Sequence, residues 1–449
     1  MRRHLITTAL SVCAATILTL SGCAGAGSLG SGGGQTVTIA MVSNLQMTDA
    51  IKLSYKFEAQ NRGIDLKFVT LPENQARAKI TMSTATGGRD FDVVMISNYE
   101  TPQWARNKWL TDLEPYIAKT PGYDKNDFIP SIRQALSYED HMYSVPFYGE
   151  SSFLMYRKDL LEQAGITLPA EPTWQQVADA AAKLDSPDMG GVCLRGKPGW
   201  GEVLAPLDTV INTFGGRWYD ENWNAQLTSP EVEKAVDFYV DTVRGYGEPG
   251  AATSGFQECA TQFSQGRAAM WYDATSAVNT VESPEASAVA DKVGYAKAPI
   301  QVKPNSGWLY TWSLGIPAAS EHKDAAWKFI SWMTDQNYIK LVGEELGRER
   351  IPPGSRLSTY QIPQYRDISA AYGPITLDSI NHADSAHPTV APVPYTGVQF
   401  LTIPEFQDLG TRVSQQISAA IAEQKSATAA LKQSQEYAEV VGKSYQEKS

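Results

Sequence analysis

Short apolar runs alternate with amphipathic segments along the first hundred residues. Residues 36–42, 64–71 and 91–96 are strand-like, and the last run is nearly continuous in apolar side chains, as in parallel strands that are buried on both faces. Residues 48–61, with Thr48 as the expected cap, and residues 75–86 are predicted to be helices that end at glycines. This order predicts an α/β lobe built of strand–helix units.

Polar residues follow each of these predicted strands. Asn44, Glu73 and Tyr99 lie in short segments that are rich in amide and carboxylate groups. Ligands of parallel α/β sheets bind outside the carboxyl ends of the strands, so we expect these three residues to face one site. The alternative explanation is ordinary turn chemistry, which also favours such residues in loops.

The pattern changes at residues 143–174. An extended run is broken by Gly149, Glu150 lies at the kink, and a second apolar run follows at 152–156. Residues 173–176 then have the Thr-x-x-Gln spacing of a capping box that opens a helix. We predict that the chain leaves one lobe here and begins another, which would bring the Glu150 side chain to the cleft between them.

Tryptophans mark several turns of the second half. Trp200 lies in a Gly- and Pro-rich loop after a predicted strand at 190–194, and Trp218 lies in a Gly-Gly-Arg-Trp turn where we expect it to be exposed. Trp308 begins an alternating segment that places Trp308, Tyr310 and Trp312 on one face of a strand. A stripe of this kind can line a ligand site or belong to the core. Single helices are expected at 323–340 and 409–444.

The N-terminus has the features of a lipoprotein signal. Two arginines precede an apolar stretch that is short for a membrane span, and Leu-Ser-Gly-Cys ends at Cys23. We expect residues 1–22 to be a signal peptide, Cys23 to be lipidated and the Gly- and Ser-rich residues 23–35 to form a tether. The alternative is an ordinary signal peptide with a chance cysteine. The sequence does not decide between the general and the twin-arginine export routes.

Two further cysteines, Cys193 and Cys259, would remain in the mature protein. An oxidising compartment permits a disulfide between them. Two separate buried thiols are equally compatible with the sequence, because spacing alone gives no distance.

Composition narrows the function. The 449 residues carry a formal net charge of −11 and include 11 Trp and 21 Tyr. The negative charge disfavours nucleic acid as a partner, because phosphates require Lys and Arg. The five histidines make no metal-binding spacing and no Gly-x-Ser-x-Gly elbow is present. We therefore expect no metal, no cofactor and no enzymatic activity. Glu150 with Asp273 or Glu73 could still be the carboxylate pair of a lipid-anchored glycosidase.

The order of motifs resembles a known family. Val-Pro-Phe-Tyr, then Leu-Met-Tyr-Arg-Lys-Asp-Leu-Leu-Glu-Gln-Ala-Gly-Ile, then Pro-Thr-Trp is similar to the solute-binding proteins of carbohydrate ABC importers, the family of maltose-binding protein. Residues 146–152, 194–197, 215–218 and 308–312 resemble its sorbitol- and mannitol-binding branch. The resemblance covers nearly the whole mature chain.

This resemblance implies a two-lobed, type II periplasmic-binding-protein fold of class α/β. Lobe 1 would comprise residues 36–148 and 308–360, and lobe 2 residues 149–307 and 361–449, with hinge crossings near 148–152 and 350–354. The implied function is capture of a polyol outside the membrane for an ABC permease, by a monomer anchored through its lipid. A mono- or disaccharide ligand is the alternative, and a surface adhesion module is a third possibility.

The resemblance also implies a set of ligand-binding residues. Those carried over from the family motifs are Asn44, Tyr99, Glu150, Arg195, Trp200, Asp273 and Trp308. Three more, Glu73, Tyr148 and Trp218, are expected from the loop argument together with general similarity.

Overall fold

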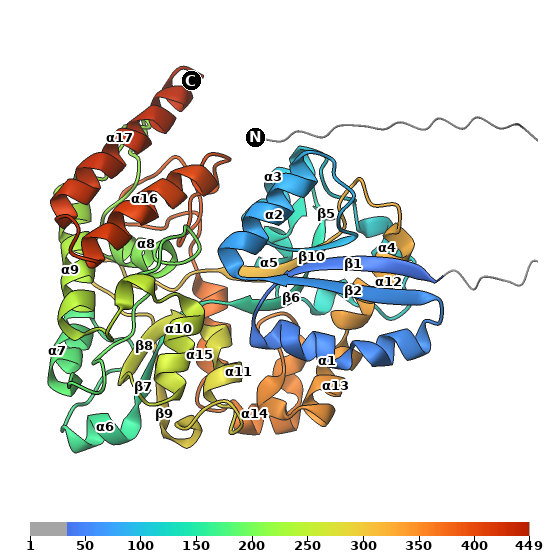
Figure 1. Ribbon diagram of the computed structural model, residues 1–449, viewed down its shortest axis with the longest axis horizontal. Helices are drawn as coiled ribbons and strands as arrows, with labels where there is room; N and C mark the ends of the chain where they lie inside the picture. The colour runs from blue at the N-terminus through green and yellow to red at the C-terminus, as the bar shows by residue number, and fades with distance from the viewer. Residues whose placement is uncertain (1–33, 449) are drawn as a thin grey trace, which may run out of the picture.

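The computed structural model describes residues 34–448, and the predicted signal peptide, Cys23 and most of the tether lie outside this range. Two sheets form the centres of two halves of the molecule (Figure 1). The first is five-stranded, in the order β2 (Ile64–Leu71), β1 (Gln35–Val42), β3 (Val93–Ser97), β10 (Tyr310–Gly315) and β6 (Ser144–Glu150). The first three strands are parallel, and β10 is antiparallel to both of its neighbours. The nearly continuous apolar run is β3, which is wholly buried as predicted.

The second sheet is smaller and antiparallel. Its order is β8 (Met270–Ala274), β7 (Ser152–Arg157) and β9 (Val293–Lys297). The strand expected at 190–194 is wrong: Gly190 and Cys193 make only single bridges, to Ala268 and Trp271, because the loop touches the β8 segment at two isolated points. Around this sheet lie α7 (Trp174–Leu184), α8 (Leu204–Thr213) and α9 (Pro230–Tyr246), and the predicted capping box opens α7.

The chain passes between the two sheets in one step. Only Ser151 separates β6 from β7. A Cβ on Gly149 would lie 2.3 Å from the carbonyl oxygen of Gly354, and the Gly149 amide donates to the Pro353 carbonyl at 3.0 Å. The two crossing segments therefore touch backbone to backbone, which only glycine at residue 149 permits.

Several helix boundaries differ from the predicted ones. Helix α1 (Leu45–Gln60) is capped by Asn44, whose Oδ1 accepts from the Met47 amide, and not by Thr48. The helix expected at 323–340 is two helices, α12 (Lys323–Met333) and α13 (Gln336–Glu345), because Asp335 caps a new start. The helix expected at 409–444 is also two, α16 (Phe406–Ile421) and α17 (Ala427–Gln446), because the chain turns at Glu423 with φ +60° and Ser426 caps the second helix.

The C-terminal helices α16 and α17 pack beside α8 and α9 in the second half (Figure 1). In the first half α2 (Glu73–Ala85) follows β2. The remaining elements are α3 (Glu100–Arg106), α4 (Glu114–Ala118), α5 (Pro130–Ala135), β4 (Ser137–Tyr138), β5 (His141–Met142), α6 (Lys158–Gln163), α10 (Phe256–Ser264), α11 (Val278–Val281), α14 (Pro363–Ile368) and α15 (Gly373–His382). Among the described residues no helix has the length and apolarity needed to span a bilayer.

Candidate functional site

A cavity lies between the two halves, at the carboxyl ends of β1 and β6. It holds about 560 Å³ of space, including that at its mouth, and both polar and aromatic side chains line it. The polar lining consists of Asn44, Glu73, Arg77, Tyr148, Glu150, Arg195, Gln257, Ser276 and Gln399. The aromatic lining consists of Trp200, Phe256, Trp308, Tyr310 and Trp312.

The amide of Asn44 is fixed from two sides. Its Oδ1 accepts from the amide of Met47, and its Nδ2 donates to the Tyr148 hydroxyl at 2.8 Å. Burial raises the pKa of Tyr148 well above its ordinary value, so the phenol keeps its proton. Capping of α1 therefore also orients an amide and a phenol toward the cavity.

A second cluster centres on Arg77, a buried residue of α2. Its Nε and Nη2 donate to Glu73 Oε1 at 3.0 and 2.9 Å, and its Nη1 donates to Glu100 Oε1 at 3.0 Å. Nη2 also donates to the Tyr310 hydroxyl. The guanidinium lies between the rings of Trp200 and Trp312, 4.2 and 4.5 Å from their centroids, in cation–π geometry.

Glu150 joins the two halves at the floor of the cavity. Its Oε2 accepts from the Ser276 hydroxyl, which follows β8 in the other half. Burial raises the pKa of Glu150 to about 8. The carboxyl is therefore largely protonated at neutral pH and can both donate and accept hydrogen bonds.

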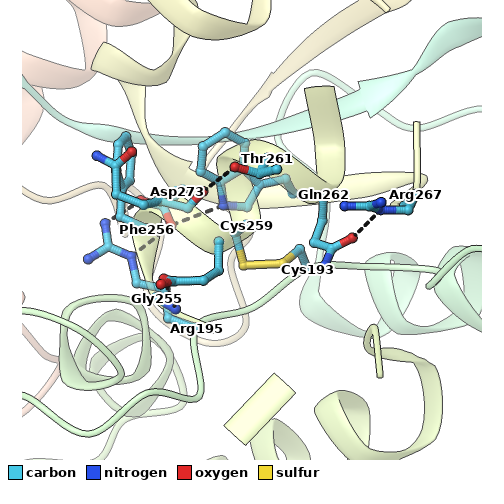
Figure 2. The surroundings of a disulfide bond; sticks show 12 residues. Cys193, Arg195, Gly255, Phe256, Cys259, Thr261, Gln262, Arg267 and Asp273 are labelled. Atoms are coloured by element: carbon cyan, nitrogen blue, oxygen red, sulfur yellow. Dashed lines mark hydrogen bonds and ion pairs between the residues drawn. A yellow bond between two sulfur atoms is a disulfide. The ribbon is translucent and has the colours of Figure 1, made fainter. Parts of the chain in front are cut away.

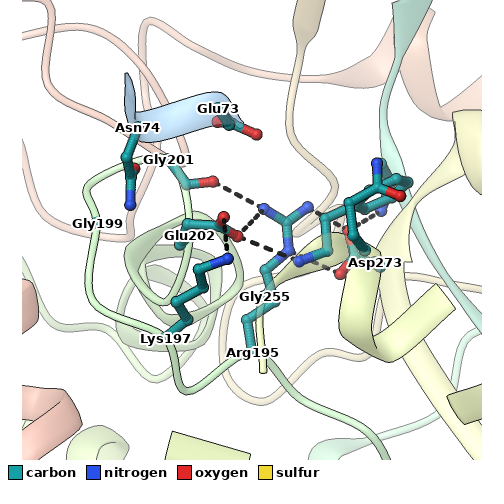
Figure 3. Close-up of polar contacts among 12 residues, drawn as sticks. Glu73, Asn74, Arg195, Lys197, Gly199, Gly201, Glu202, Gly255 and Asp273 are labelled. Atoms are coloured by element: carbon teal, nitrogen blue, oxygen red, sulfur yellow. Dashed lines mark hydrogen bonds and ion pairs between the residues drawn. The ribbon is translucent and has the colours of Figure 1, made fainter. Parts of the chain in front are cut away.

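Arg195 is held by Asp273 from behind (Figure 3). Its Nε donates to Asp273 Oδ2 at 2.8 Å, its Nη2 to Oδ1 at 2.5 Å, and its Nη1 to the Gly201 carbonyl at 2.7 Å. Asp273 has no exposed surface and also accepts from Trp271 Nε1 at 3.0 Å. These bonds use three of the five N–H donors of Arg195, so two are left for a ligand.

Glu202 is a second carboxylate close to Arg195. Its Oε2 lies 3.7 Å from Arg195 Nη1, and its Oε1 lies 3.7 Å from Lys197 Nζ. Burial raises the pKa of Glu202 to about 7, with Glu73 acting in the same direction.

A disulfide supports this wall of the cavity (Figure 2). Cys193, two residues before Arg195, is bonded to Cys259 of α10, with their Cα atoms 5.7 Å apart. The first residues of α10, Phe256 and Gln257, themselves line the cavity. Of the two alternatives that the sequence left open, the structure has the bridge. Cys193, Cys259 and Glu248 form the one group within residues 34–448 whose ligand atoms are close enough together to hold a metal ion. Both sulfurs are already bonded to each other in the disulfide.

Trp308 has a buried donor that is unpaired within the described residues. Its indole is buried and lines the cavity, and its Nε1 has no hydrogen-bond partner among the described residues. A buried N–H without a partner costs free energy, which a ligand hydroxyl could recover. The strand itself begins at Tyr310, so Trp308 lies just before β10, whereas Tyr310 and Trp312 belong to it.

Seven of the ten expected ligand-binding residues line the cavity: Asn44, Glu73, Tyr148, Glu150, Arg195, Trp200 and Trp308. Asp273 lies behind Arg195 and is absent from the lining. Tyr99 packs under Trp200, 4.8 Å between ring centroids, and its hydroxyl donates to the Ile403 carbonyl. The expected exposure of Trp218 is wrong: it is 1% exposed, because Phe406 of α16 covers it and Asp208 accepts from its Nε1.

The sequence reasoning missed Arg77, Ser276, Phe256, Gln257 and Gln399. Arg77 could have been found from the sequence, because Glu73 and Arg77 are four residues apart and therefore lie on one face of a helix. The others lie in segments with no distinguishing pattern.

Hydrogen bonds also join the two halves directly. Gln46 Nε2 donates to Asn279 Oδ1 at 2.8 Å, and Gln257 Nε2 donates to the Ser43 carbonyl at 3.2 Å. Asn74 Nδ2 donates to the Pro198 carbonyl at 3.0 Å. The two halves are therefore in contact around the cavity.

Residues 45–338 match the family of bacterial extracellular solute-binding proteins, and the chain belongs to this family. A mannitol-binding protein of Pseudomonas aeruginosa is 44% identical over 90% of this chain and 92% of its own length.

Solved structures agree with this assignment. An ABC transporter solute-binding protein of Agrobacterium vitis S4, solved with bound D-mannitol, is 45% identical with a TM-score of 0.89, over 92% of this chain and 99% of that one. A maltose-bound protein of T. maritima is 21% identical with a TM-score of 0.76, over 90% and 99% of the two chains, and so shares the fold. The chain therefore has the two-lobed α/β fold, and its family is extracellular and binds solutes.

Proposed function

We propose that this protein captures a hexitol, such as D-mannitol or sorbitol, and delivers it to an ABC permease. The observation that carries this proposal is the buried cavity between the lobes, with an amide, a phenol, a protonated carboxyl and a guanidinium set among aromatic faces. Each hydroxyl of a polyol must be paired when it is buried, since an unpaired one costs about 1–3 kcal/mol. The D-mannitol bound by the relative from Agrobacterium vitis supports a hexitol over a sugar ring.

A sugar ligand is the competing proposal. A linear hexitol lacks the ring oxygen and anomeric centre of a pyranose and is thinner. Trp200 and Trp308 both line the cavity, and flat aromatic faces on its walls favour the thinner chain. A glycosidase would use two carboxyls, and Glu73 and Glu150 both line the cavity, so a substrate assay with product analysis accompanies the binding test.

Calorimetry with hexitols, pentitols, glucose and maltose tests this proposal. We expect hexitols to bind most tightly, and maltose binding more tightly than every alditol would overturn the assignment. Glu150→Ala should weaken hexitol binding by about 0.5–1.5 kcal/mol, as for a hydrogen bond to a neutral group. Arg195→Ala should weaken it by about 1.5–3 kcal/mol, as for hydrogen bonds to a charged group, which is roughly ten- to a hundred-fold in Kd. Released sugar product would favour the glycosidase.

We further infer a lipid anchor and a hinge. Cys23 and the Gly- and Ser-rich tether support the anchor, and Cys23→Ala should release a folded protein from membranes. A variant that still sediments with membranes would contradict this. The proposed division into residues 36–148 with 308–360 and residues 149–307 with 361–449 is supported by the two sheets, except that Gly149 and Glu150 belong to β6 of the first sheet. The Gly149–Gly354 contact is the proposed pivot, about which a monomer closes on its ligand.

A further inference from the structure

A second hollow adjoins the cavity, and Arg77 and Trp200 line both. This hollow holds about 630 Å³ and lies between α2, residues 198–200 and α16. The two spaces therefore share a wall made of one indole and one guanidinium.

Neighbouring side chains pack closely around Trp200. Trp200 is 4% exposed; the Arg77 guanidinium covers its ring, and the Tyr99 ring is 4.8 Å away. A Cβ on Gly410 of α16 would lie 2.8 Å from Trp200 Cβ, so the base of the Trp200 side chain packs closely against that helix. Contacts with Arg77, Tyr99 and α16 therefore hold the Trp200 side chain between the two spaces.

The second hollow has the chemistry of a sugar subsite. Asn74, Gln407, Thr411 and Gln415 present amides and a hydroxyl, while Pro198 and the indole present apolar surface. Sites for small polar ligands combine a few placed hydrogen-bonding groups with apolar walls in this way. One side of the hollow is held by the bond from Asn74 to the Pro198 carbonyl, and Figure 3 shows Asn74 facing the loop at Gly199.

We propose that Trp200, backed by Arg77, sets the upper length of the ligand. An alditol fills the first cavity. A glycosyl-alditol would need to place its sugar ring in the second hollow, and the Trp200 indole blocks that path. This inference rests on the proposed hexitol function and adds the specificity-determining residue.

Calorimetry with sorbitol and with maltitol, its glucosyl derivative, tests whether Trp200 limits the length of the ligand. The variant is Trp200→Ala, which joins the two spaces. The matched control is Trp308→Ala, which enlarges the first cavity and does not border the second. We expect the wild type to bind sorbitol more tightly than maltitol. In Trp200→Ala the preference for sorbitol over maltitol, measured as the ratio of the two Kd values, should fall at least about tenfold. In Trp308→Ala the same ratio should change less than about threefold.

Trp200→Leu is the second variant, used if Trp200→Ala loses its cooperative thermal transition, and the same direction of shift is expected. An unchanged ratio in the folded Trp200 variant overturns the inference, and so does wild-type binding of maltitol as tight as that of sorbitol. Failure of the hexitol proposal is distinguishable, because the wild type would then bind no alditol. In that case the ratio of the Kd values for glucose and maltose would be compared between the wild type and the Trp200 variant.

Discussion

Two buried arginines line the cavity, one from each lobe, and they are held in different ways. Arg77 of the first lobe donates to two carboxylates and a phenol and lies between two indoles. Arg195 of the second lobe depends on one carboxylate, Asp273, for its two shortest charged contacts. The first arginine has distributed support, and the second has a single main partner.

The difference indicates different roles. Arg77 has four of its five N–H donors engaged by Glu73, Glu100 and Tyr310, so it acts mainly as part of the wall. Arg195 has two donors that make no hydrogen bond within the described residues, with Glu202 3.7 Å from Nη1, and is better suited to bind a hydroxyl. Removal of one partner should therefore affect the two sites very unequally.

The largest effect is expected for Asp273→Ala. The substitution leaves the buried Arg195 without its main partner, and breaking a buried pair in this way costs about 3–5 kcal/mol. Glu100→Ala in the other cluster should cost about 1–3 kcal/mol, because Arg77 keeps Glu73 and Tyr310. Urea unfolding monitored by circular dichroism measures both.

Asp273→Asn is the control for this pair, since it retains an acceptor oxygen and removes the charge. We expect its stability to lie between those of the wild type and Asp273→Ala. A cost for Glu100→Ala that equals or exceeds that of Asp273→Ala would contradict the view that the two arginines are supported differently.

The disulfide is the next way to test the asymmetry, since it supports only the Arg195 side. Cys193 and Cys259 are 66 residues apart, and closing a loop of this size stabilises a protein by about 2–4 kcal/mol. The double variant Cys193→Ala, Cys259→Ala should lose this much free energy of unfolding and bind hexitol more weakly. Added reductant should have no further effect on the double variant. Unchanged affinity in the folded double variant would show that the bridge does not position Arg195.

The sequence predicted the features that depend on neighbours along the chain. The capping box at Thr173 and the parallel strands of the first lobe were both readable, because cap chemistry and strand patterns act over a few residues. The break expected at Gly149 is wrong, because β6 continues through it to Glu150, and the change of sheet comes at Ser151.

The features that depend on distant segments were not predictable. Trp218 follows a glycine turn typically found at a surface, and only the distant Phe406 covers it. Asp273 was expected to bind the ligand, and its position behind Arg195 depends on the fold. Arg77 becomes a wall residue only when Trp200, from the other lobe, meets it.

A pH-dependent effect is expected from Glu150, which lines the cavity together with both arginines. Burial raises its pKa from 4.5 to about 8, so between these values the folded state holds a proton that the unfolded state has lost. Stability without ligand therefore falls as pH rises from about 4.5 to about 8, by up to about 1.4 kcal/mol per pH unit.

Glu150→Gln isolates this contribution, because Glu202 gives a slope of the same sign. The wild type minus Glu150→Gln difference in unfolding free energy should fall across this pH range and be flat above it. A difference that rises with pH would mean that Glu150 is ionised in the folded protein.

The smallest expected effect comes from Gly201, the residue through which the Arg195 wall meets the Arg77 cluster. Its carbonyl accepts from Arg195, and a Cβ at this position would lie 2.4 Å from Glu73 Oε1. Gly201→Ala should therefore hold the lobes slightly apart, weakening hexitol binding by about 1 kcal/mol, several-fold in Kd. Gly245→Ala is the control, since a Cβ there meets nothing within 4 Å, and its affinity should be unchanged. Solution scattering should show that ligand reduces the radius of gyration of Gly201→Ala less than that of the wild type. Equal affinity and equal compaction in Gly201→Ala would mean that Glu73 moves aside, and that the two clusters are less tightly coupled than their contact implies.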